Sequence, residues 1–270
     1  MKRIRQTIGL IGCGNMGSAI VTGLLENRIA GARRVFVYDS LAGKKRRMAR
    51  LYRVRSTQNL AELVRVSAII LLAVKPQDLS AVAKEIRSVL KSGHVVISIL
   101  AGVPIRKLRR LLGGQPAVVR AMPNLGAQVG EAVTALASPK RSALQTAEII
   151  FSGCGKTVRL DEKYFDVVTA LSGSGPAYFF LMMELLAKCG QAQGLSKEAS
   201  RLLAVQTALG AGRLAEATGD SPEALRKKVT SKKGTTEAAL GVLFRKGFPK
   251  IFQSAVHQAI RRSKALSRLS

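Results

Sequence analysis

A glycine-rich hexapeptide near the amino end has the spacing of a dinucleotide-binding turn. Its residues are Gly12, Cys13, Gly14, Asn15, Met16 and Gly17. An apolar run over residues 7–11 precedes the turn and a helical pattern follows it, so the glycines join a strand to a helix. In that setting Gly12 makes the tight turn, Gly14 admits a pyrophosphate to the backbone, and Gly17 lets the helix pack on the strand. The sequence therefore predicts a dinucleotide diphosphate on the free N–H groups of this helix.

Two groups of residues give opposing signals about the adenosine end of such a cofactor. Asp39 lies 22 residues beyond Gly17, at the end of a second predicted strand, and Ser40 follows it. A carboxylate there accepts hydrogen bonds from the ribose and repels a 2′-phosphate, which favours NAD. Four cations follow within a helical turn and are either a 2′-phosphate site or a solvated helix face: Lys44, Lys45, Arg46 and Arg47. We expect NADPH or NADH, with the choice open.

Two further motifs leave strand ends at the same predicted edge of the sheet. The first follows a central apolar run and consists of Ala73, Val74, Lys75 and Pro76. The second is RAMPN at residues 120–124, in which Asn124 either caps a helix or contacts substrate. Ligands of open parallel sheets bind beyond the carboxyl ends of the strands. We therefore assign residues 73–76 to the cofactor site.

Two loops of small residues open helices in the second half of the chain. One is LSGSGPA at residues 171–177, and the other is VTSKKGTT at residues 229–236. The second loop places hydroxyls and free N–H groups at one helix N-terminus, through Ser231, Gly234, Thr235 and Thr236. Such a group can receive a carboxylate, although a capping loop without a ligand has the same composition.

The order and spacing of these motifs resemble those of the pyrroline-5-carboxylate reductase family. The segments that carry the resemblance are IGLIGCGNMG, LAVKPQ, RAMPN, ALSGSGPAY and VTSKKGTT. The resemblance implies hydride transfer from NAD(P)H to 1-pyrroline-5-carboxylate, giving L-proline in the last step of proline biosynthesis. It also implies that residues 12–17 and 73–76 bind the cofactor. Ser231, Gly234, Thr235 and Thr236 would bind the substrate carboxylate and imine, with Thr236 as the catalytic candidate that orients the imine nitrogen.

The chain departs from the family pattern at three places. Lys232 and Lys233 stand where members more often have Pro-Gly, residues 125–126 where Thr-Pro is usual, and Leu100 where Ala is usual. A glycine at position 233 can take a positive φ, so Lys233 puts the backbone of the substrate loop in question. Alternatively, Lys233 adds charge attraction for a carboxylate.

The secondary structure that positions these motifs differs between the two halves of the chain. Over residues 7–160, short β-rich runs alternate with helical stretches, which predicts a doubly wound parallel sheet of the Rossmann type. Predicted strands cover residues 7–11, 34–38, 68–74, 95–100 and 117–122, with 132–137 and 157–160 closing the far edge. Predicted helices cover residues 16–27, 44–52, 60–64, 79–90 and 104–112, with Asn59 as a cap.

Beyond residue 160, the predicted secondary structure is entirely helical. Helices are expected at residues 177–192, 197–217, from 221 onward, at 235–244 and at 248–266. They are apolar on more than one face, which indicates burial against another subunit. We therefore predict an NAD(P)-binding Rossmann domain at residues 1–160 and a helical dimerisation and substrate domain at 161–270. The expected assembly is a homodimer or a larger oligomer of dimers.

Composition limits the remaining classes of function. The chain of 270 residues has 44 Lys and Arg against 16 Asp and Glu, a net charge of +28. Nine basic residues fall between 33 and 55, but there is no basic tail, zinc-finger spacing or aromatic interleaving, so we expect only non-specific contact with nucleic acid. No apolar run approaches the ~18 residues of a membrane span. Three scattered cysteines favour the cytoplasm, and isolated His94 and His257 favour no metal site.

Two rival functions stay open at this stage. One is another two-domain reductase, acting on a β-hydroxyacid or a different imine. Hydroxyacid enzymes of that layout need a catalytic lysine in the helical domain, and none of Lys163, Lys188 and Lys197 lies in a matching motif. The other is a basic nucleic-acid-binding protein that retains a Rossmann domain.

Overall fold

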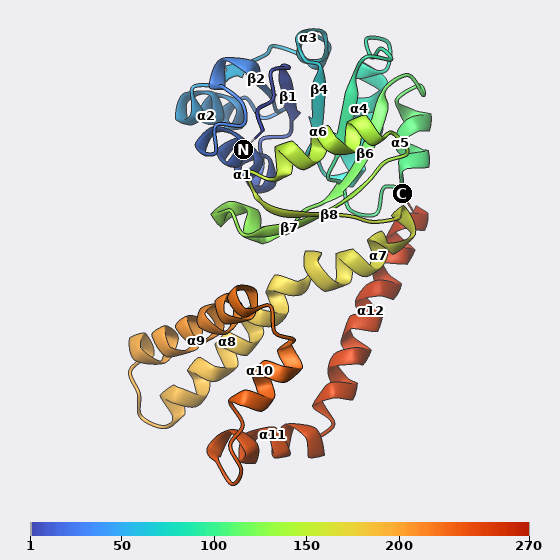
Figure 1. Ribbon diagram of the computed structural model, residues 1–270. Coiled ribbons are helices and arrows are strands. Elements are labelled where there is room, and N and C mark those ends of the chain that lie inside the picture. The colour runs from blue at the N-terminus through green and yellow to red at the C-terminus, as the bar shows by residue number, and fades with distance from the viewer. Residues whose placement is uncertain (1, 270) are drawn as a thin grey trace. The chain divides into compact units, whose positions relative to one another are not determined.

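The computed structural model describes residues 2–269, with side chains up to residue 267, as two compact units (Figure 1). One unit contains the residues up to 173 together with 259–269, and the other contains 174–258. This division differs from the boundary that we predicted after residue 160. Phe165, in the short helix α7 (Phe165–Val168), is 1% exposed and belongs to the core beside the sheet, so α7 is part of the first compact unit.

The first unit is built on an eight-stranded sheet with the order β3-β2-β1-β4-β5-β6-β7-β8. The predicted strands are confirmed, with ends that shift by a few residues, and a two-residue edge strand β3 is added. The strands are β1 (Ile8–Ile11), β2 (Val35–Tyr38), β3 (Arg55–Ser56), β4 (Ile69–Leu72), β5 (Val95–Ser98), β6 (Ala117–Met122), β7 (Ala132–Ala137) and β8 (Gly155–Arg159). The β1–β4 ladder pairs Ile8 with Ile69, so both strands end at one edge.

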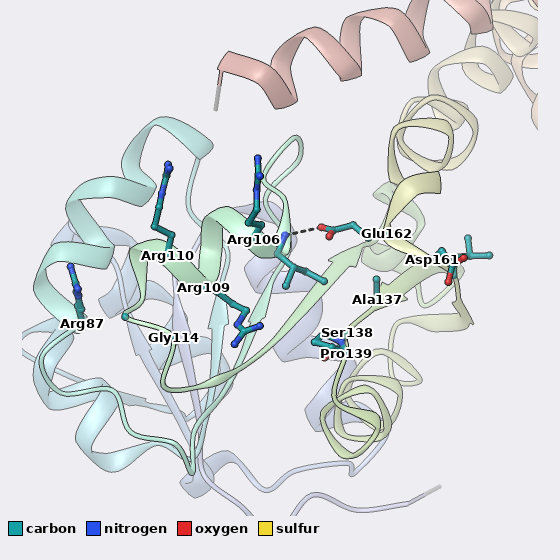
Figure 2. A pocket seen from close by; sticks show the side chains of 13 residues that line it. Arg87, Arg106, Arg109, Arg110, Gly114, Ala137, Ser138, Pro139, Asp161 and Glu162 are labelled. Atoms are coloured by element: carbon teal, nitrogen blue, oxygen red, sulfur yellow. Dashed lines mark hydrogen bonds between the residues drawn. The ribbon is translucent and has the colours of Figure 1, made fainter.

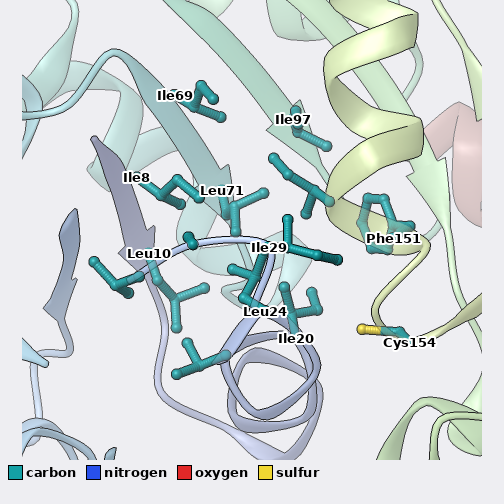
Figure 3. Close-up of a cluster of buried hydrophobic side chains, with 14 of the residues drawn as sticks. Ile8, Leu10, Ile20, Leu24, Ile29, Ile69, Leu71, Ile97, Phe151 and Cys154 are labelled. Carbon is teal, nitrogen blue, oxygen red and sulfur yellow. The ribbon is translucent and has the colours of Figure 1, made fainter. Parts of the chain in front are cut away.

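Two buried clusters cover the two faces of this sheet. In β1, Leu10 faces the cluster that contains α1 (Asn15–Glu26), α2 (Ala42–Tyr52) and α6 (Arg141–Phe151), shown in Figure 3. Ile11 faces the opposite cluster, with the helices α3 (Leu60–Val66), α4 (Leu79–Ile86) and α5 (Ile105–Leu111). Side chains alternate along a strand, so a fully buried apolar strand needs helices on both faces. The fold class is therefore the predicted doubly wound α/β arrangement.

The far edge of the sheet departs from a purely parallel arrangement. Strand β7 runs antiparallel to β6, with Arg120 opposite Ala137. Only the short 3₁₀ helix η3 (Leu125–Val129) separates the two strands, and a parallel crossover needs a dozen residues or more. Helix α6, which we did not predict, provides the longer connection from β7 to β8, and these two strands are parallel.

The second unit is all-helical, as predicted. It contains α8 (Gly175–Ala192), α9 (Lys197–Thr218), α10 (Pro222–Lys228), α11 (Thr235–Arg245) and the first half of α12 (Phe248–Leu269). The rest of α12 belongs to the first unit, where the hydroxyls of Ser263 and Ser267 donate to Asp166. Within residues 2–269, no helix is both long and apolar enough to cross a membrane.

The helical unit has almost no core of its own within one chain. Phe179 is 66% exposed and Leu202 is 65% exposed, while Ser200 and Ala204 are the buried residues of α9. Apolar area of this kind normally marks a surface that another protein covers.

Candidate active site

The glycine turn is shaped by three glycines with different physical reasons. Gly12 has a φ of +104°, and a Cβ there would lie 2.5 Å from the carbonyl oxygen of Ala73. A Cβ on Gly17 would lie 2.3 Å from the carbonyl oxygen of Gly12. A Cβ on Gly14 would meet no atom within 4 Å, and the φ of Gly14 is −77°. The fold thus requires Gly12 and Gly17, whereas the space over Gly14 is open to a ligand.

Open space at Gly14 fits a dinucleotide diphosphate. Gly14 is the N-cap of α1, whose first N–H groups have no intrahelical acceptor and lie at the positive end of the helix dipole. No carboxylate occupies the first turn of α1. An anion can therefore reach these donors without displacing a side chain that caps them.

Asp39 fastens the end of β2 to the glycine turn. Its Oδ2 accepts a hydrogen bond from the Cys13 N–H at 2.8 Å, and its Oδ1 accepts one from the Leu41 N–H at 2.9 Å. Carboxylate oxygens keep further lone pairs, so ribose hydroxyls can still donate to them. Burial, and secondly the charge of Asp39, raise the pKa of the Cys13 thiol to about 12, so this thiol stays neutral.

A cleft of about 590 Å³ lies along the carboxyl ends of β1, β2 and β4. Seven of the predicted cofactor residues line it: Gly12, Gly14, Asp39, Ser40, Ala73, Val74 and Lys75. Cys13 and Asn15 line an adjoining hollow of about 470 Å³ between α1 and α2, and Gly14 lines both. Met16, Gly17 and Pro76 line neither. Sequence reasoning missed Tyr38 and Leu41 as lining residues, although each adjoins a predicted one, and Gln77, the last residue of the LAVKPQ motif, also lines the cleft.

The basic run that begins α2 divides into residues with different roles. Lys44 lines both the cleft and the hollow, and Arg47 lines the hollow. The Nζ of Lys45 donates to the Thr57 carbonyl at 2.9 Å and lies 5.3 Å from the Tyr38 ring centroid. Arg46 is exposed and lines neither space. Of these four cations, Lys44 is the one that lines the same cleft as Asp39 in the part of the chain that the structure describes.

The RAMPN segment is held by an ion pair between the buried Arg120 and the half-buried Glu162. Arg120 is 5% exposed, its Nη1 lies 3.1 Å from Glu162 Oε1, and its guanidinium lies 4.7 Å from the Phe165 ring centroid. Glu162 also accepts a hydrogen bond from the Ile105 N–H at 2.7 Å. Sequence reasoning did not identify Glu162. Asn124 begins η3 without a side-chain capping bond, and its buried Oδ1 has no protein partner among residues 2–269.

The substrate loop places the four predicted residues at the start of α11. Gly234 is the N-cap, with φ −84°, and its N–H donates to the Ser231 carbonyl at 3.0 Å. A Cβ on Gly234 would lie 2.3 Å from the Ser231 hydroxyl oxygen, so these two residues are in close contact. Thr235 and Thr236 are the first two helical residues, and the first N–H groups of a helix lack intrahelical acceptors.

Lys233 adopts the positive φ that a glycine at this position would take readily. Its φ is +60°, in the left-handed region, and its N–H donates to Glu237 Oε2 at 2.6 Å. Glu237 therefore holds the loop from the first turn of α11, a role that sequence reasoning missed. Glutamate at this third helical position commonly reaches back to cap the N-terminus.

Family models match both parts of the chain. A model described as pyrroline-5-carboxylate reductase dimerisation matches residues 162–266, and one described as NADP oxidoreductase, coenzyme F420-dependent, matches residues 7–102. The first match begins close to the predicted boundary at 160–161. It supports a homo-oligomer.

Whole-chain comparisons agree with these models. Pyrroline-5-carboxylate reductases from Methanosarcina acetivorans and Synechocystis are each 38% identical, over 97% of this chain and 98% of the relative. A solved reductase of the same description from Coxiella burnetii has a TM-score of 0.91 at 34% identity, covering 97% of this chain and 99% of that one.

A second solved structure, an NADP-bound pyrroline carboxylate reductase from Plasmodium falciparum, has a TM-score of 0.88 at 31% identity, covering 98% of this chain and 99% of that one. A 3-hydroxyisobutyrate dehydrogenase, at 15% identity and a TM-score of 0.53, shares the fold alone. The chain belongs to the pyrroline-5-carboxylate reductase family, oxidoreductases that act on a CH–NH group with NAD(P).

Proposed function

We propose that this chain reduces 1-pyrroline-5-carboxylate to L-proline with NADH or NADPH, as the last step of proline biosynthesis. The observation that carries the proposal is the open space over Gly14 at the N-terminus of α1, in a chain of this family. No fold requirement explains a glycine there, whereas a bound pyrophosphate does.

The residues of the first unit would hold the cofactor, which supplies the hydride when bound. The N–H groups after Gly14 face the pyrophosphate, and Asp39 accepts from the ribose. Lys44 lies at the cleft where a 2′-phosphate is recognised, so both NADH and NADPH are compatible with these residues. Residues 73–75 also line this cleft.

The substrate loop would bind the carboxylate of the pyrroline. The substrate is small, so this carboxylate is its one strong handle for orientation. The free N–H groups of Thr235 and Thr236 receive it, and the Ser231 hydroxyl supplies a further donor. The hydroxyl of Thr236 orients the imine nitrogen. A cyclic imine can carry its own proton at neutral pH, so orientation replaces a dedicated acid.

The assembly that we propose is a homodimer or a larger oligomer of dimers, formed through the helical unit. The exposed apolar side chains of α8 and α9 support this proposal. Three free cysteines, at positions 13, 154 and 189, support a reducing compartment such as the cytoplasm. Contact with nucleic acid is proposed to be non-specific only.

The test is to measure oxidation of NADH and of NADPH separately, each with and without 1-pyrroline-5-carboxylate, and to identify proline as the product. Turnover that depends on the imine is the expected result, and the ratio of the two kcat/KM values gives the cofactor preference. Salt-dependent retention on DNA without any imine-dependent turnover would contradict the proposal.

A further inference from the structure

A second concave site lies at the opposite edge of the sheet, where the chain enters β1. It has a volume of about 670 Å³, and five arginines line it: Arg3, Arg5, Arg28, Arg34 and Arg53. We call it the arginine cleft. None of these five forms an ion pair with an acidic side chain in the part of the chain that the structure describes. The first 55 residues contain 13 Lys and Arg against two acidic residues, so the cleft is not neutralised from nearby.

The backbone of the arginine cleft is fixed rather than a loose end of the chain. Ile4 is 6% exposed and its N–H donates to the Ile29 carbonyl at 2.8 Å, which anchors the segment that carries Arg3 and Arg5. The Nη1 of Arg34 donates to the carbonyl oxygen of Arg5. A guanidinium has five N–H donors, so Arg34 keeps donors for a ligand. The arginines are therefore held around one concavity.

Two of the five arginines occupy unfavourable backbone positions. Arg28 and Arg53 both have a φ of +53°, just after the helices α1 and α2. Glycine or asparagine takes such positions at lower cost, and strained residues tend to cluster at functional sites. A single cation after each helix would satisfy the helix dipole. That explanation does not account for Arg3, Arg5 and Arg34, which line the same space.

Another arginine-lined pocket, of about 800 Å³, lies beside α5 and differs from the arginine cleft (Figure 2). Arg109 points to the opposite side of α5 from Arg106 and Arg110. Asp161 and Glu162 also line that pocket, and their charges oppose an anion. It therefore serves as a control for the arginine cleft.

We propose that the arginine cleft binds a compact oligophosphate, a ligand with several linked phosphate groups such as inorganic tripolyphosphate or a nucleoside triphosphate. Guanidinium groups match phosphate oxygens with paired hydrogen bonds, and the cleft contains arginines and no lysine. Its volume lies in the range of small-ligand sites. Tyr52 is the one aromatic residue in its lining, which is too little for a row of stacked bases and so disfavours single-stranded nucleic acid.

The test is calorimetric titration of the full chain, with saturating NADH present to occupy the cofactor cleft. Inorganic tripolyphosphate, ATP and monophosphate are compared at one ionic strength. In the test variant, Arg28→Asn and Arg53→Asn are combined, because asparagine tolerates a positive φ and removes the charge. In the control variant, Arg109→Asn and Arg110→Asn remove the same charge from α5. A third variant, Arg3→Ser with Arg5→Ser, alters exposed side chains and gives a second test if the first variant melts early.

We expect tripolyphosphate to bind the unaltered chain far more tightly than monophosphate. The dissociation constant should rise at least about tenfold in the first and third variants and less than about twofold in the control. If ATP binds as tightly as tripolyphosphate, the triphosphate group alone is recognised. If ATP binds more weakly, the ligand is an inorganic oligophosphate. Equal losses in test and control variants, or tighter binding of a single-stranded oligonucleotide with the same number of phosphates, would overturn the proposal.

Discussion

The cofactor turn and the substrate loop both lead into the N-terminus of a helix, yet they meet their backbone constraints with different residues. In the cofactor turn, only glycine fits at position 12, because φ is +104° and a Cβ would collide with the carbonyl of Ala73, just beyond the neighbouring strand β4. In the substrate loop, Lys233 occupies φ +60° on an exposed turn where a Cβ has room. Left-handed backbone costs a side chain about 1–2 kcal/mol. A steric collision excludes every other residue, whereas this smaller cost permits a residue that adds positive charge.

The largest expected effect is a loss of cofactor affinity when Gly14 is replaced, with the fold retained. Gly14→Val places a side chain in the space that no protein atom approaches, so the chain should fold normally and lose NAD(P)H affinity by about 100-fold or more. Fluorescence titration with NADH and NADPH measures the loss, and thermal melting checks the fold. Gly17→Ala is the matched comparison, because its Cβ meets the Gly12 carbonyl and should lower the melting temperature instead. Unchanged cofactor affinity in folded Gly14→Val would show that Gly14 serves only the turn.

The next largest effect is a fall in kcat/KM when one hydroxyl is removed from the substrate loop. Thr236→Val keeps the shape of the side chain, so kcat/KM for the imine should fall about 10- to 100-fold, which corresponds to ~1.4–2.7 kcal/mol. The dissociation constant for NADPH should stay the same, because the cofactor residues belong to the other unit. Normal turnover by this variant would mean that Thr236 only begins α11.

A smaller effect is expected on the KM for NADPH, and it should differ between the cations of α2. Lys44→Ala should raise the KM for NADPH about three- to tenfold and leave the KM for NADH nearly unchanged, because Lys44 is exposed and its contact is partly screened by water. Arg46→Ala removes the same charge from a residue outside the cleft and should change neither value. Equal effects of the two substitutions on both cofactors would mean that the run is a solvated face.

The smallest effect tests the cost of the lysine in the substrate loop. Lys233→Gly should stabilise the chain by about 1 kcal/mol, raising the melting temperature by roughly 2–4 °C. Asparagine also tolerates a positive φ, so Lys233→Asn is a second variant that removes the charge of the lysine without straining the backbone. If Lys233 attracts the substrate carboxylate, both should raise the KM for the imine slightly. A lower melting temperature in both would show that the lysine side chain stabilises the loop.

The sequence was most informative where one local pattern determines the outcome. Continuous apolar runs predicted β1 and β4, and the Oδ1 of Asn59 caps α3 by accepting from the Glu62 N–H at 2.8 Å, as expected. The missed helix α6 did carry a signal, since Ala143, Ala147 and Ile150 recur at helical spacing and are buried. The direction of β7 depends on the length of the connection that precedes it.

Tertiary partners could not be predicted from a local pattern. Glu162 acts through Arg120 and the Ile105 N–H, which are more than 40 residues away in the sequence. The functional division at residues 160–161 remains a prediction, because the compact units divide at 173–174 while the matching dimerisation model begins at 162. The roles of individual residues in binding substrate and cofactor also remain predictions, since they concern ligands rather than the fold.

The two hydrogen bonds of Asp39 limit how the cofactor preference can be re-engineered. Replacing an acidic residue at this position is a direct way to admit a 2′-phosphate, but here the same carboxylate holds the N–H groups of Cys13 and Leu41. Losing it would leave two backbone donors without their acceptor, at a cost of about 1–3 kcal/mol for each one that stays buried. A designer seeking strict NADPH use should therefore keep Asp39 and Lys44 and vary Ser40. The side chain of Ser40 lines the cleft and forms no hydrogen bond on which the turn depends, in the part of the chain that the structure describes.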